Sequence, residues 1–327
     1  MKKIRSKKVW RLVGASFVLL AFLSSVNVCL GAEPMRLIMV GGSSGATVHL
    51  YFAAVAPLLN KYIPGMEATA STGGPAENIP LLELGDIKLA GISVGAGVEI
   101  YGKEWLKKTR LRTIFAMFHV PYHILVPKDS PIQQFSDLKG KRVSVGAKGS
   151  GESYIFQRLL DVMDMKESDM KMKIEYLGKG EAINAYKDRV LDAICGQGPL
   201  PMPAILELVS HPRGVRIVGL APQVIQKIVE KYPEYTEYTI EKKWYTHALK
   251  DAADIPSFTQ WHYMATRDDF PENMVYQITK VLDERYDELV TAFKSANSST
   301  AENTAKYPGF KLHPGTARYL KEKGLIK

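Results

Sequence analysis

The sequence predicts an α/β protein made of two similar halves. Short apolar runs alternate with segments of helical periodicity from Met35 onwards, a pattern typical of mostly parallel sheets with helices on their faces. The length of 327 residues fits two domains or lobes better than one. The alternation occurs twice, without a repeated sequence and without a low-complexity linker between the halves. We therefore expect two lobes that are joined by strands.

The composition excludes several classes of protein. The chain is 46% hydrophobic and 24% charged with two cysteines, which excludes a disordered chain, a collagen-like repeat and a disulfide scaffold. The formal charge is +9, but six positive charges lie in the first eleven residues: Lys2, Lys3, Arg5, Lys7, Lys8 and Arg11. Because the excess is concentrated in this segment, we predict no nucleic-acid partner.

The N-terminal segment predicts export. A twelve-residue apolar run, residues 12–23, follows the basic cluster and leads into the sequence SSVNVCLGA. These are the parts of a secretory signal peptide, here residues 1–31, and the run is shorter than the ~20 residues of a membrane span. An uncleaved anchor is the alternative. Removal of the signal leaves Cys195 as the single cysteine, in an apolar segment where we expect a buried thiol and no nucleophile.

The first half contains four expected strands and two expected helices. The strands are residues 35–40, 67–70, 88–93 and 112–118. The helices are residues 46–62 and 75–84, the second beginning at Pro75 and ending at Gly85. Pro57 is predicted to kink or split the first helix, because proline removes a helical hydrogen bond.

The second half repeats this alternation. Its expected strands are residues 123–127, 142–146, 173–177, 192–195 and 215–220, and its expected helices are residues 136–140 (capped by Ser136), 152–163, 180–187 and 222–232. An extended tyrosine-rich region follows. A strand at 260–266, one long helix at 271–293 and a last helix that begins at Pro314 complete the chain.

One strand–loop–helix motif recurs in both halves. In it, a strand is followed by a loop rich in Gly, Ser and Thr and then by a helix N-terminus. It occurs at residues 41–47, 71–76 and 149–153, with a related turn at 196–199. Glycines let the backbone approach a ligand, and free helix N–H groups favour an anion. Such loops gather at the carboxyl ends of the strands. We expect a site that holds a small anionic or zwitterionic molecule from both lobes, without catalytic residues.

Two chemical alternatives have to be weighed. Residues 41–45 match G-x-S-x-G, the nucleophile elbow of a serine hydrolase, with Ser43 as the nucleophile. Only about ten mature residues precede the motif, whereas that fold places several strands before it, so a simple Gly/Ser loop is favoured. His119 and His123 are four residues apart, but strand geometry around Pro121 separates their Cα atoms by about 13 Å. We therefore predict no metal and no cofactor.

Ordered motifs reveal a family resemblance. They are G-G-S-S-G-A-T at 41–47, S-T-G-G-P-A-E-N at 71–78, D-L-K-G-K-R-V-S-V-G at 137–146, G-S-G at 149–151 and L-H-P-G at 312–315. With these motifs the chain resembles the TAXI family of extracytoplasmic solute receptors, which serve TRAP-type transporters. The likeness covers essentially the whole mature chain.

The resemblance implies a two-lobed, periplasmic-binding-protein-like α/β fold of type II, with a mixed, mainly parallel sheet in each lobe and a ligand cleft between them. Residues 33–119 plus 260–327 would form lobe 1, and residues 120–259 lobe 2. The implied function is a monomeric, non-enzymatic periplasmic receptor. It would capture a small carboxylate or a glutamate-like amino acid by hinge closure and deliver it to TRAP permease subunits.

The resemblance also assigns ligand-binding residues. In lobe 1 these are Ser43, Ser44, Gly45, Thr47, His49, Thr72, Gly73, Gly74, Asn78, Ser93 and Val94, and in lobe 2 Ser150, Gly151, Glu152, Ser153, Gln197 and Gly198. Tyr122 and Trp261 are added because they lie near the expected lobe crossovers.

Some of these assignments have structural alternatives. Asn78 is equally well explained by a local hydrogen bond at the helix start. His49 stands where the family has aromatic residues, and it forms either a wall of the site or an exposed helix face. Glu152 departs from the common Gly-Thr-Glu pattern, and the neighbouring Lys148 either attracts an acidic ligand or lies on the surface. A periplasmic sensor of the same fold remains the alternative function, and a secreted serine hydrolase a weaker one.

Overall fold

The computed structural model describes residues 34–42, 44, 46–148, 150–170, 173–245 and 253–327. The predicted signal peptide and the predicted ligand residues Ser43 and Gly45 lie outside the described residues. Residues Met35–Lys327 form one compact unit. Within the described ranges, no helix combines the length and the apolar character that a bilayer crossing requires.

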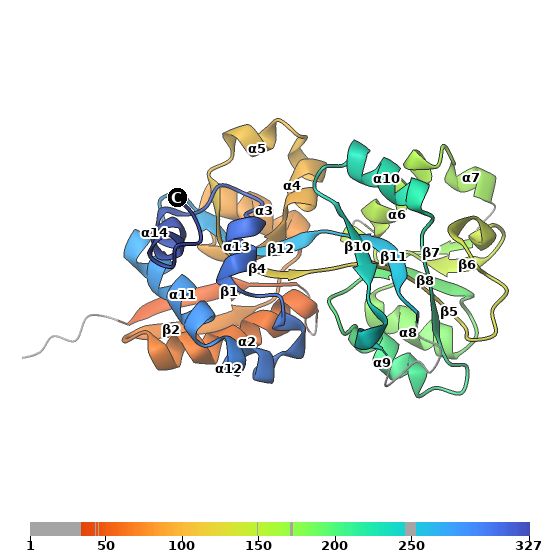
Figure 1. Cartoon of the computed structure of the whole chain (residues 1–327), viewed down its shortest axis with the longest axis horizontal. Helices are drawn as coiled ribbons and strands as arrows, with labels where there is room; N and C mark the ends of the chain where they lie inside the picture. The colour runs from red at the N-terminus through yellow and green to blue at the C-terminus, as the bar shows by residue number, and fades with distance from the viewer. Residues whose placement is uncertain (1–33, 43, 45, 149, 171–172, 246–252) are drawn as a thin grey trace, which may run out of the picture. The chain divides into compact units, whose positions relative to one another are not determined.

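The first sheet has the strand order β2-β1-β3-β12-β4 (Figure 1). Its strands are β1 (Met35–Val40), β2 (Met66–Ser71), β3 (Leu89–Ser93), β4 (Leu111–His119) and β12 (Trp261–Arg267). Strand β1 pairs in parallel with β2 and β3, whereas β12 is antiparallel to both β3 and β4. Four strands therefore point one way, and the strand that returns from the second half points the other way.

The second sheet has the same plan, in the order β7-β6-β8-β5-β9. Its strands are β5 (Tyr122–Val126), β6 (Arg142–Ser144), β7 (Lys173–Glu175), β8 (Ala193–Gln197) and β9 (Arg216–Val218). Here β5 is the inserted antiparallel strand, between β8 and β9. A separate ribbon pairs β10 (Thr236–Ile240) with β11 (Ile255–Thr259). Two mixed sheets of identical order, each with one inserted strand, confirm the predicted two-lobed α/β fold of type II.

Helices cover both faces of each sheet. Around the first sheet these are α2 (Thr47–Tyr62), α3 (Pro75–Leu84), α4 (Val94–Tyr101), α5 (Trp105–Lys108), α11 (Glu272–Glu284), α12 (Tyr286–Ala292), α13 (Ala301–Lys306) and α14 (Pro314–Glu322). Around the second they are α6 (Gly151–Val162), α7 (Glu167–Met170), α8 (Lys179–Lys187), α9 (Pro203–Val209) and α10 (Pro222–Lys231). The first sheet with its helices forms lobe 1, and the second sheet with its helices and the β10–β11 ribbon forms lobe 2.

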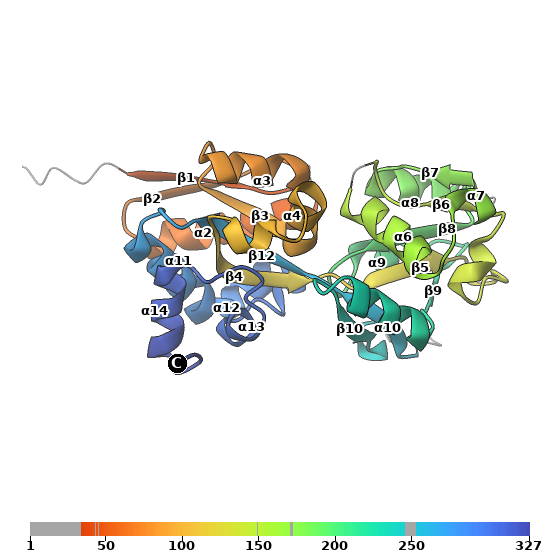
Figure 2. The same cartoon turned by 90° about the horizontal axis from the view of Figure 1, so that it is seen from above.

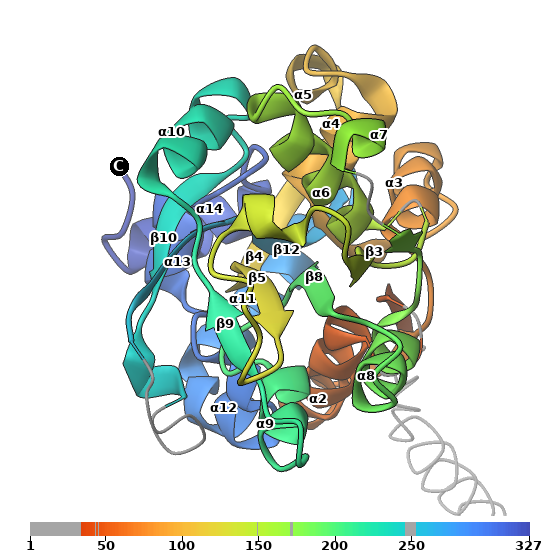
Figure 3. The same ribbon diagram turned by 90° about the vertical axis from the view of Figure 1, so that its right-hand side faces the viewer.

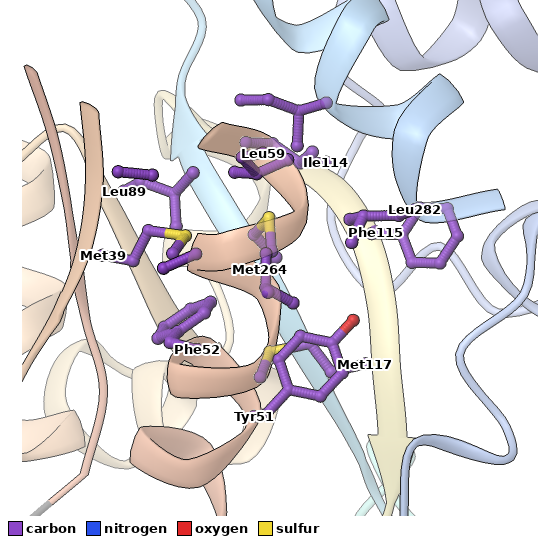
Figure 4. Packing of buried hydrophobic residues seen from close by; sticks show 14 of the residues in the cluster. Met39, Tyr51, Phe52, Leu59, Leu89, Ile114, Phe115, Met117, Met264 and Leu282 are labelled. Carbon is purple, nitrogen blue, oxygen red and sulfur yellow. The ribbon is translucent and has the colours of Figure 1, made fainter. Parts of the chain in front are cut away.

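Helix α2 anchors the core of lobe 1 because its apolar residues recur at helical spacing. Tyr51, Phe52, Val55 and Leu59 are fully buried against the sheet and against α11. Figure 4 shows Phe52 and Leu59 of α2 packed near Met39, Leu89 and Met264 of the sheet.

The predicted split of this helix at Pro57 is wrong, because α2 continues through Pro57 to Tyr62, whereas the alternative of a kink stays a prediction. Pro57 is exposed, so the hydrogen bond that it cannot make lies on the solvent side of the helix.

In lobe 2, α6 and α10 pack on one face of the sheet, and α8 and α9 pack on the other (Figure 3). The amphipathic helix α6 buries Phe156, Leu159 and Leu160 in the first of these layers. Each lobe therefore has its own apolar core, as the two-lobe prediction requires.

The predicted long helix at 271–293 is instead two helices, α11 and α12. Arg285 separates them with φ −113° and ψ 26°, outside the helical region. Its guanidinium lies 4.2 Å from the ring centroid of Tyr62, and the break lets Leu289 of α12 reach the core. The uniform helical periodicity of the segment gave no sign of this change of direction.

The predicted helix at 136–140 with a Ser136 cap is also wrong. The segment is a single 3₁₀ turn, Phe135–Leu138, which begins after Gln134. The carboxylate of Asp137 accepts hydrogen bonds from the backbone N–H groups of Gln133 and Gln134 and so determines the start of the turn. The helices α4, α5, α7, α9 and α13 and the strand β11 were not predicted.

Two short crossovers join the lobes. Strand β4 ends at His119 and β5 begins at Tyr122, while β11 ends at Thr259 and β12 begins at Trp261. The crossovers lie side by side (Figure 2), because the N–H of Val120 donates to the carbonyl of Gln260 at 2.9 Å. With so few connecting residues, the end of the first sheet at which β4 terminates faces the end of the second at which β5 begins. The carboxyl ends of the parallel strands of both sheets are therefore at this junction.

Substitution of two glycines, one in α4 and one in α8, tests how closely these two helices are packed. A Cβ at Gly97 in α4 would overlap the indole of Trp105, whereas a Cβ at Gly180 in α8 would meet open space. The indole cannot yield easily, because its Nε1 donates to Glu83 at 2.7 Å and its ring packs on Tyr101. We expect Gly97→Ala to lower the free energy of unfolding by about 1–3 kcal/mol.

Gly180→Ala is the matched control and should be neutral or stabilising by up to about 1 kcal/mol, because alanine favours the helix. Urea unfolding followed by circular dichroism measures both. Equal effects in the two variants would contradict the packing around Trp105.

Candidate functional site

The loops at the carboxyl ends of β1 and β2 run side by side. The N–H of Gly41 donates to the carbonyl of Ser71 at 2.8 Å, and that of Gly73 to Gly42 at 3.2 Å. The amide of Asn78, which is 1% exposed, donates to the carbonyl of Gly41 at 3.0 Å. Asn78 therefore connects the two predicted ligand loops. Among the described residues its Oδ1 is buried and accepts no hydrogen bond, so one half of the amide is structural and the other half has no partner.

Helix α2 begins at this end of the sheet without a side-chain cap, since its N-cap residue is Ala46. Its first-turn N–H groups, from Thr47 to His49, therefore have no partner within the helix. His49 is half-buried, with a buried Nδ1 that has no partner, which argues against a simple exposed helix face. Ser44 and Thr72 are exposed on the same loops, and Gly74 is the uncapped start of α3.

Ser93 is buried at the end of β3, where its hydroxyl accepts a hydrogen bond from the N–H of Ala96 at 3.3 Å. The side chain therefore caps α4, which begins with Val94. A ligand would have to share this hydroxyl with the helix.

In lobe 2, the predicted serines are largely occupied by capping. Ser150 Oγ accepts from the N–H of Ser153 at 3.3 Å, and Ser153 Oγ donates to the carbonyl of Ser150 at 2.9 Å. By contrast, Ser144 Oγ, at the end of β6, is buried without a partner. Gly151 is held close to Gln197, since a Cβ there would lie 2.8 Å from the Gln197 amide nitrogen. Lys148 is exposed, as its surface interpretation requires.

Glu152 and Lys179 form the charged pair of this loop region. The two charged groups are 3.6 Å apart, and Lys179 also donates to the carbonyl of Gln197 at 3.1 Å. The Glu152 side chain is only 22% exposed. Lys179, at the start of α8, was not among the predicted residues.

Gln260 and His262 bring a second unpredicted group of polar atoms to the junction. Gln260 Nε2 donates to Gln197 Oε1 at 2.9 Å and so links the crossover with lobe 2, while Gln260 Oε1 is buried without a partner. The His262 ring is stacked on Phe118 at 5.5 Å, and neither ring nitrogen has a partner. Burial lowers the pKa of His262 to about 4, so the ring is neutral at pH 7.

Both residues lie in the sequence Gln-Trp-His, in which Gln260 immediately precedes β12 and His262 is the second residue of that strand. A sequence feature could have identified these two residues: they are polar, and they lie where the chain crosses from one lobe to the other.

Among the residues that the structure describes, buried polar atoms without partners are concentrated at this junction. Those at the facing sheet ends are His49 Nδ1, Asn78 Oδ1, His119 Nδ1, Ser144 Oγ, Gln260 Oε1, and His262 Nδ1 and Nε2. Leaving such a group unpaired costs about 1–3 kcal/mol, which is why native proteins contain few of them. A polar molecule that supplied partners to several of these atoms would recover part of this cost.

The two predicted aromatic residues are packed against other rings. Trp261 is stacked on Tyr307 at 5.1 Å and contacts the ring of His119 at 5.2 Å. Tyr122 is stacked on Phe258 at 5.5 Å. Gly198 is also buried near Tyr122, and its N–H donates to the carbonyl of Pro121 at 3.3 Å. Ligand contacts of these three residues remain predictions.

A second charged cluster connects the lobes beside the junction. Arg158 of α6 is 9% exposed and pairs with the buried Glu234 at 2.8 Å and with Glu99 of α4, in lobe 1, at 2.9 Å. Its guanidinium also donates to the hydroxyl of Tyr235 at 2.6 Å and lies 4.6 Å from the Tyr232 ring centroid. One guanidinium therefore bridges the two lobes.

Within the part of the chain that the structure describes, no cluster of three or more His, Cys, Asp and Glu side chains could hold a metal ion. The buried position of Cys195 confirms the prediction of a structural thiol. A surface cavity of about 380 Å³ lies away from the junction, lined by Asp161, Val162, Asp164, Lys227, Glu230 and Lys231. Five of its six lining residues are charged, and none belongs to the predicted site.

Comparison with known proteins gives one family and several remote structures. The model of the NMT1-like family matches residues 39–324. The alkanesulfonate-binding protein SsuA from Xanthomonas axonopodis pv. citri, bound to MOPS, is 17% identical with a TM-score of 0.43, over 89% of this chain and 84% of that chain. The probable amino-acid ABC transporter extracellular-binding protein ytmK from Bacillus subtilis is 15% identical with a TM-score of 0.46, over 85% and 99%.

A structure described for glutathione import via GshT and the cystine ABC importer TcyBC of Streptococcus mutans is 13% identical, with a TM-score of 0.49. It is covered over 98% of its length by 86% of this chain.

The buried thiol predicts resistance to labelling. Burial raises the pKa of Cys195 to about 12, so the native thiol stays protonated at pH 7–9. In a Cys29→Ser background, we expect a thiol reagent to react with the native protein only at the rate at which the site opens, and rapidly in urea. Since the unfolded thiol ionises near pH 8.5, this group stabilises the fold fully below that pH, and its contribution falls between about pH 8.5 and 12. Rapid native labelling that rises with pH would contradict the buried placement.

The Arg158 cluster predicts a large loss of stability. Arg158→Met leaves the carboxylate of Glu234, whose side chain is 3% exposed, without its cationic partner. We expect a loss of about 3–5 kcal/mol in the free energy of unfolding, measured in urea. The control is Arg36→Met, because the Arg36 side chain is 82% exposed and pairs with the exposed Glu67. The urea midpoint of this variant should hardly differ from that of the wild-type protein. A stable Arg158→Met protein would show that Glu234 is not buried as a charge.

Proposed function

Because this chain belongs to the NMT1-like family and buried polar groups of both lobes converge at one junction, we propose that it is an extracytoplasmic solute-binding protein. The observation that carries the proposal is the concentration of unpartnered polar atoms where the carboxyl ends of the two sheets face each other. In open α/β folds, ligands bind at this end of the strands. The proposal includes no catalytic step.

The lobes are proposed to move about the two crossovers. Lobe 1 would comprise residues 33–119 plus 260–327, and lobe 2 residues 120–259. Val120, Pro121 and Gln260 are then the hinge, and few residues have to change their backbone angles during opening. Opening would break the contact of Arg158 with Glu99, and the hydrogen bond of 2.7 Å from Asn297 to the carbonyl of Leu200. A ligand that contacts both lobes favours the closed arrangement by its differential affinity for it.

The proposed ligand contacts come from both lobes. In lobe 1 the groups without a partner are Asn78 Oδ1, His49 Nδ1 and the first-turn N–H groups of α2, and in lobe 2 Ser144 Oγ. Glu152 and Gln197, which already contact Lys179 and Gln260, are the other proposed contacts of lobe 2. Their chemistry suits a small carboxylate or an amino acid, because helix N–H groups and amides bind carboxylate oxygens. Hydroxyls that cap helices, such as Ser93 and Ser150, would contribute less.

The TAXI-like order of motifs supports a finer proposal. The protein would be exported by its N-terminal signal, residues 1–31, act as a monomer in the periplasm and deliver its ligand to TRAP permease subunits. Reconstitution tests the delivery step: uptake of the identified ligand into proteoliposomes that contain a TRAP permease should require this protein. Uptake through an ABC-type permease instead would overturn the TRAP assignment and leave the receptor function standing.

Ligand binding predicts a thermal shift. A ligand at 100 times its Kd adds about 2.7 kcal/mol to the free energy of unfolding, or roughly 5 °C in Tm for a protein of this size. The screen covers amino acids, dicarboxylates, 2-oxoacids and sugars, after unfolding and refolding to remove any copurified ligand. Small-angle scattering with and without the ligand found should show a smaller radius of gyration in its presence. No shift with any compound class would contradict the proposed function.

A further inference from the structure

Gln260 and His262 expose to the junction polar atoms that the fold does not use. Gln260 is 5% exposed, and its Oε1 has no partner although its Nε2 donates across to Gln197. The ring of His262 is held flat on Phe118, with an interplanar angle of 22°, and both ring nitrogens are free. A neutral imidazole presents one donor and one acceptor. The start of β12 therefore offers two acceptors and one donor at a site from which water is largely excluded.

Glu152 approaches the same place from lobe 2. Among the described residues its carboxylate accepts no hydrogen bond, and its one ion pair, with Lys179, is long at 3.6 Å. The charges of Glu152 and Lys179 act in opposite directions on the pKa of His262, since the carboxylate raises it and the ammonium lowers it. The contacts of Gln197 place the pair beside Gln260: a Cβ at Gly196 would lie 3.6 Å from Glu152 Cγ, Lys179 donates to the carbonyl of Gln197 at 3.1 Å, and Gln197 Oε1 accepts from Gln260. Lys179 donates to the carbonyl of Gln197 and not to Glu152, so a ligand with only negative groups would bring like charge to a carboxylate that lacks a hydrogen-bond donor among the described residues.

We propose that Gln260 and His262 are ligand-contacting residues, and that Glu152 is the counter-ion of a cationic nitrogen in the ligand. The ligand is then a zwitterion, and simple mono- and dicarboxylates are excluded. Its N–H groups donate to Glu152 and to Gln260 Oε1, and its carboxylate lies at the uncapped start of α2 in lobe 1. The inference rests on the proposed function and names the ligand class and the residues that select it.

A structural explanation of the same residues makes a different prediction. If His262 only fills space on Phe118, then His262→Phe, which keeps a flat ring, leaves binding unchanged. If Glu152 only balances Lys179, then Glu152→Gln alters stability without altering the preference between ligands. Selectivity between matched ligands therefore distinguishes the two explanations.

The experiment measures matched pairs of probes by isothermal titration calorimetry. Each pair is an amino acid and its deaminated analogue: glutamine with glutaramate, glutamate with glutarate, and alanine with propionate. We expect at least one amino acid to bind the wild-type protein, and its analogue to bind at least tenfold more weakly, because a hydrogen bond to a charged group is worth about tenfold to hundredfold in affinity. Glu152→Gln should reduce this preference to about threefold or less, and His262→Phe and Gln260→Leu should each weaken binding about tenfold.

Glu207→Gln is the matched control. Glu207 also pairs with a lysine of lobe 2, Lys187, but it lies on α9 and half of its side chain is exposed. The Glu207→Gln variant should keep the wild-type affinity for the amino acid and the wild-type preference for it over its deaminated analogue. Circular dichroism and the urea midpoint report whether each variant is folded, and His262→Gln replaces His262→Phe if the latter is not.

Three results would overturn the inference. They are analogues that bind as tightly as their amino acids, a preference that survives Glu152→Gln, and a His262→Phe protein with wild-type affinity. In each case a ligand still binds, so the receptor function stands. If none of the wider screening compounds binds the wild-type protein, the proposed function itself fails.

Discussion

The arrangement of the site depends on the two crossovers. They contain so few residues, Val120 with Pro121 and Gln260, that the end of β4 must face the beginning of β5. Since four strands of each sheet run in the same direction, every loop at the carboxyl ends of those strands is brought to one junction. The backbone bond between Val120 and Gln260 keeps the crossovers together. A longer or single linker would leave the same loops on two independent surfaces.

Separate cores allow the junction to remain polar. The layer around Phe52 and Phe115 stabilises lobe 1, and the layer around Phe156 and Leu159 stabilises lobe 2, so neither lobe depends on apolar contact with the other. Groups that would be costly inside either core, such as His262 and Gln260 Oε1, are tolerated between them. Because the apolar cores supply the stability of both lobes, these groups can remain without a partner between them.

Much of the fold followed from local pattern, and the errors arose where distant contacts intervene. The periodicity of α2 and the glycine that ends α3 were sufficient to predict those helices. The break at Arg285 was not predictable in this way, because it depends on Leu289 reaching a core that includes residues of α2, more than two hundred positions earlier. At Pro57 the error was of the opposite kind, because the sequence predicted a split in a helix that is continuous. Helix α2 tolerates this proline because Pro57 is exposed in the folded protein.

By itself the sequence determined the two α/β halves and the loops at which polar groups meet, because strands, glycine-rich turns and helix starts are local properties of the chain. The tertiary structure alone decided which of those groups are free. Ser93 and Ser150 cap helices, while Asn78 keeps one unpaired atom. His262 and Lys179 were missed, since they reach the junction through strand pairing and helix placement. Whether a buried polar atom has a partner depends on neighbours that are remote in sequence, and no local pattern records them.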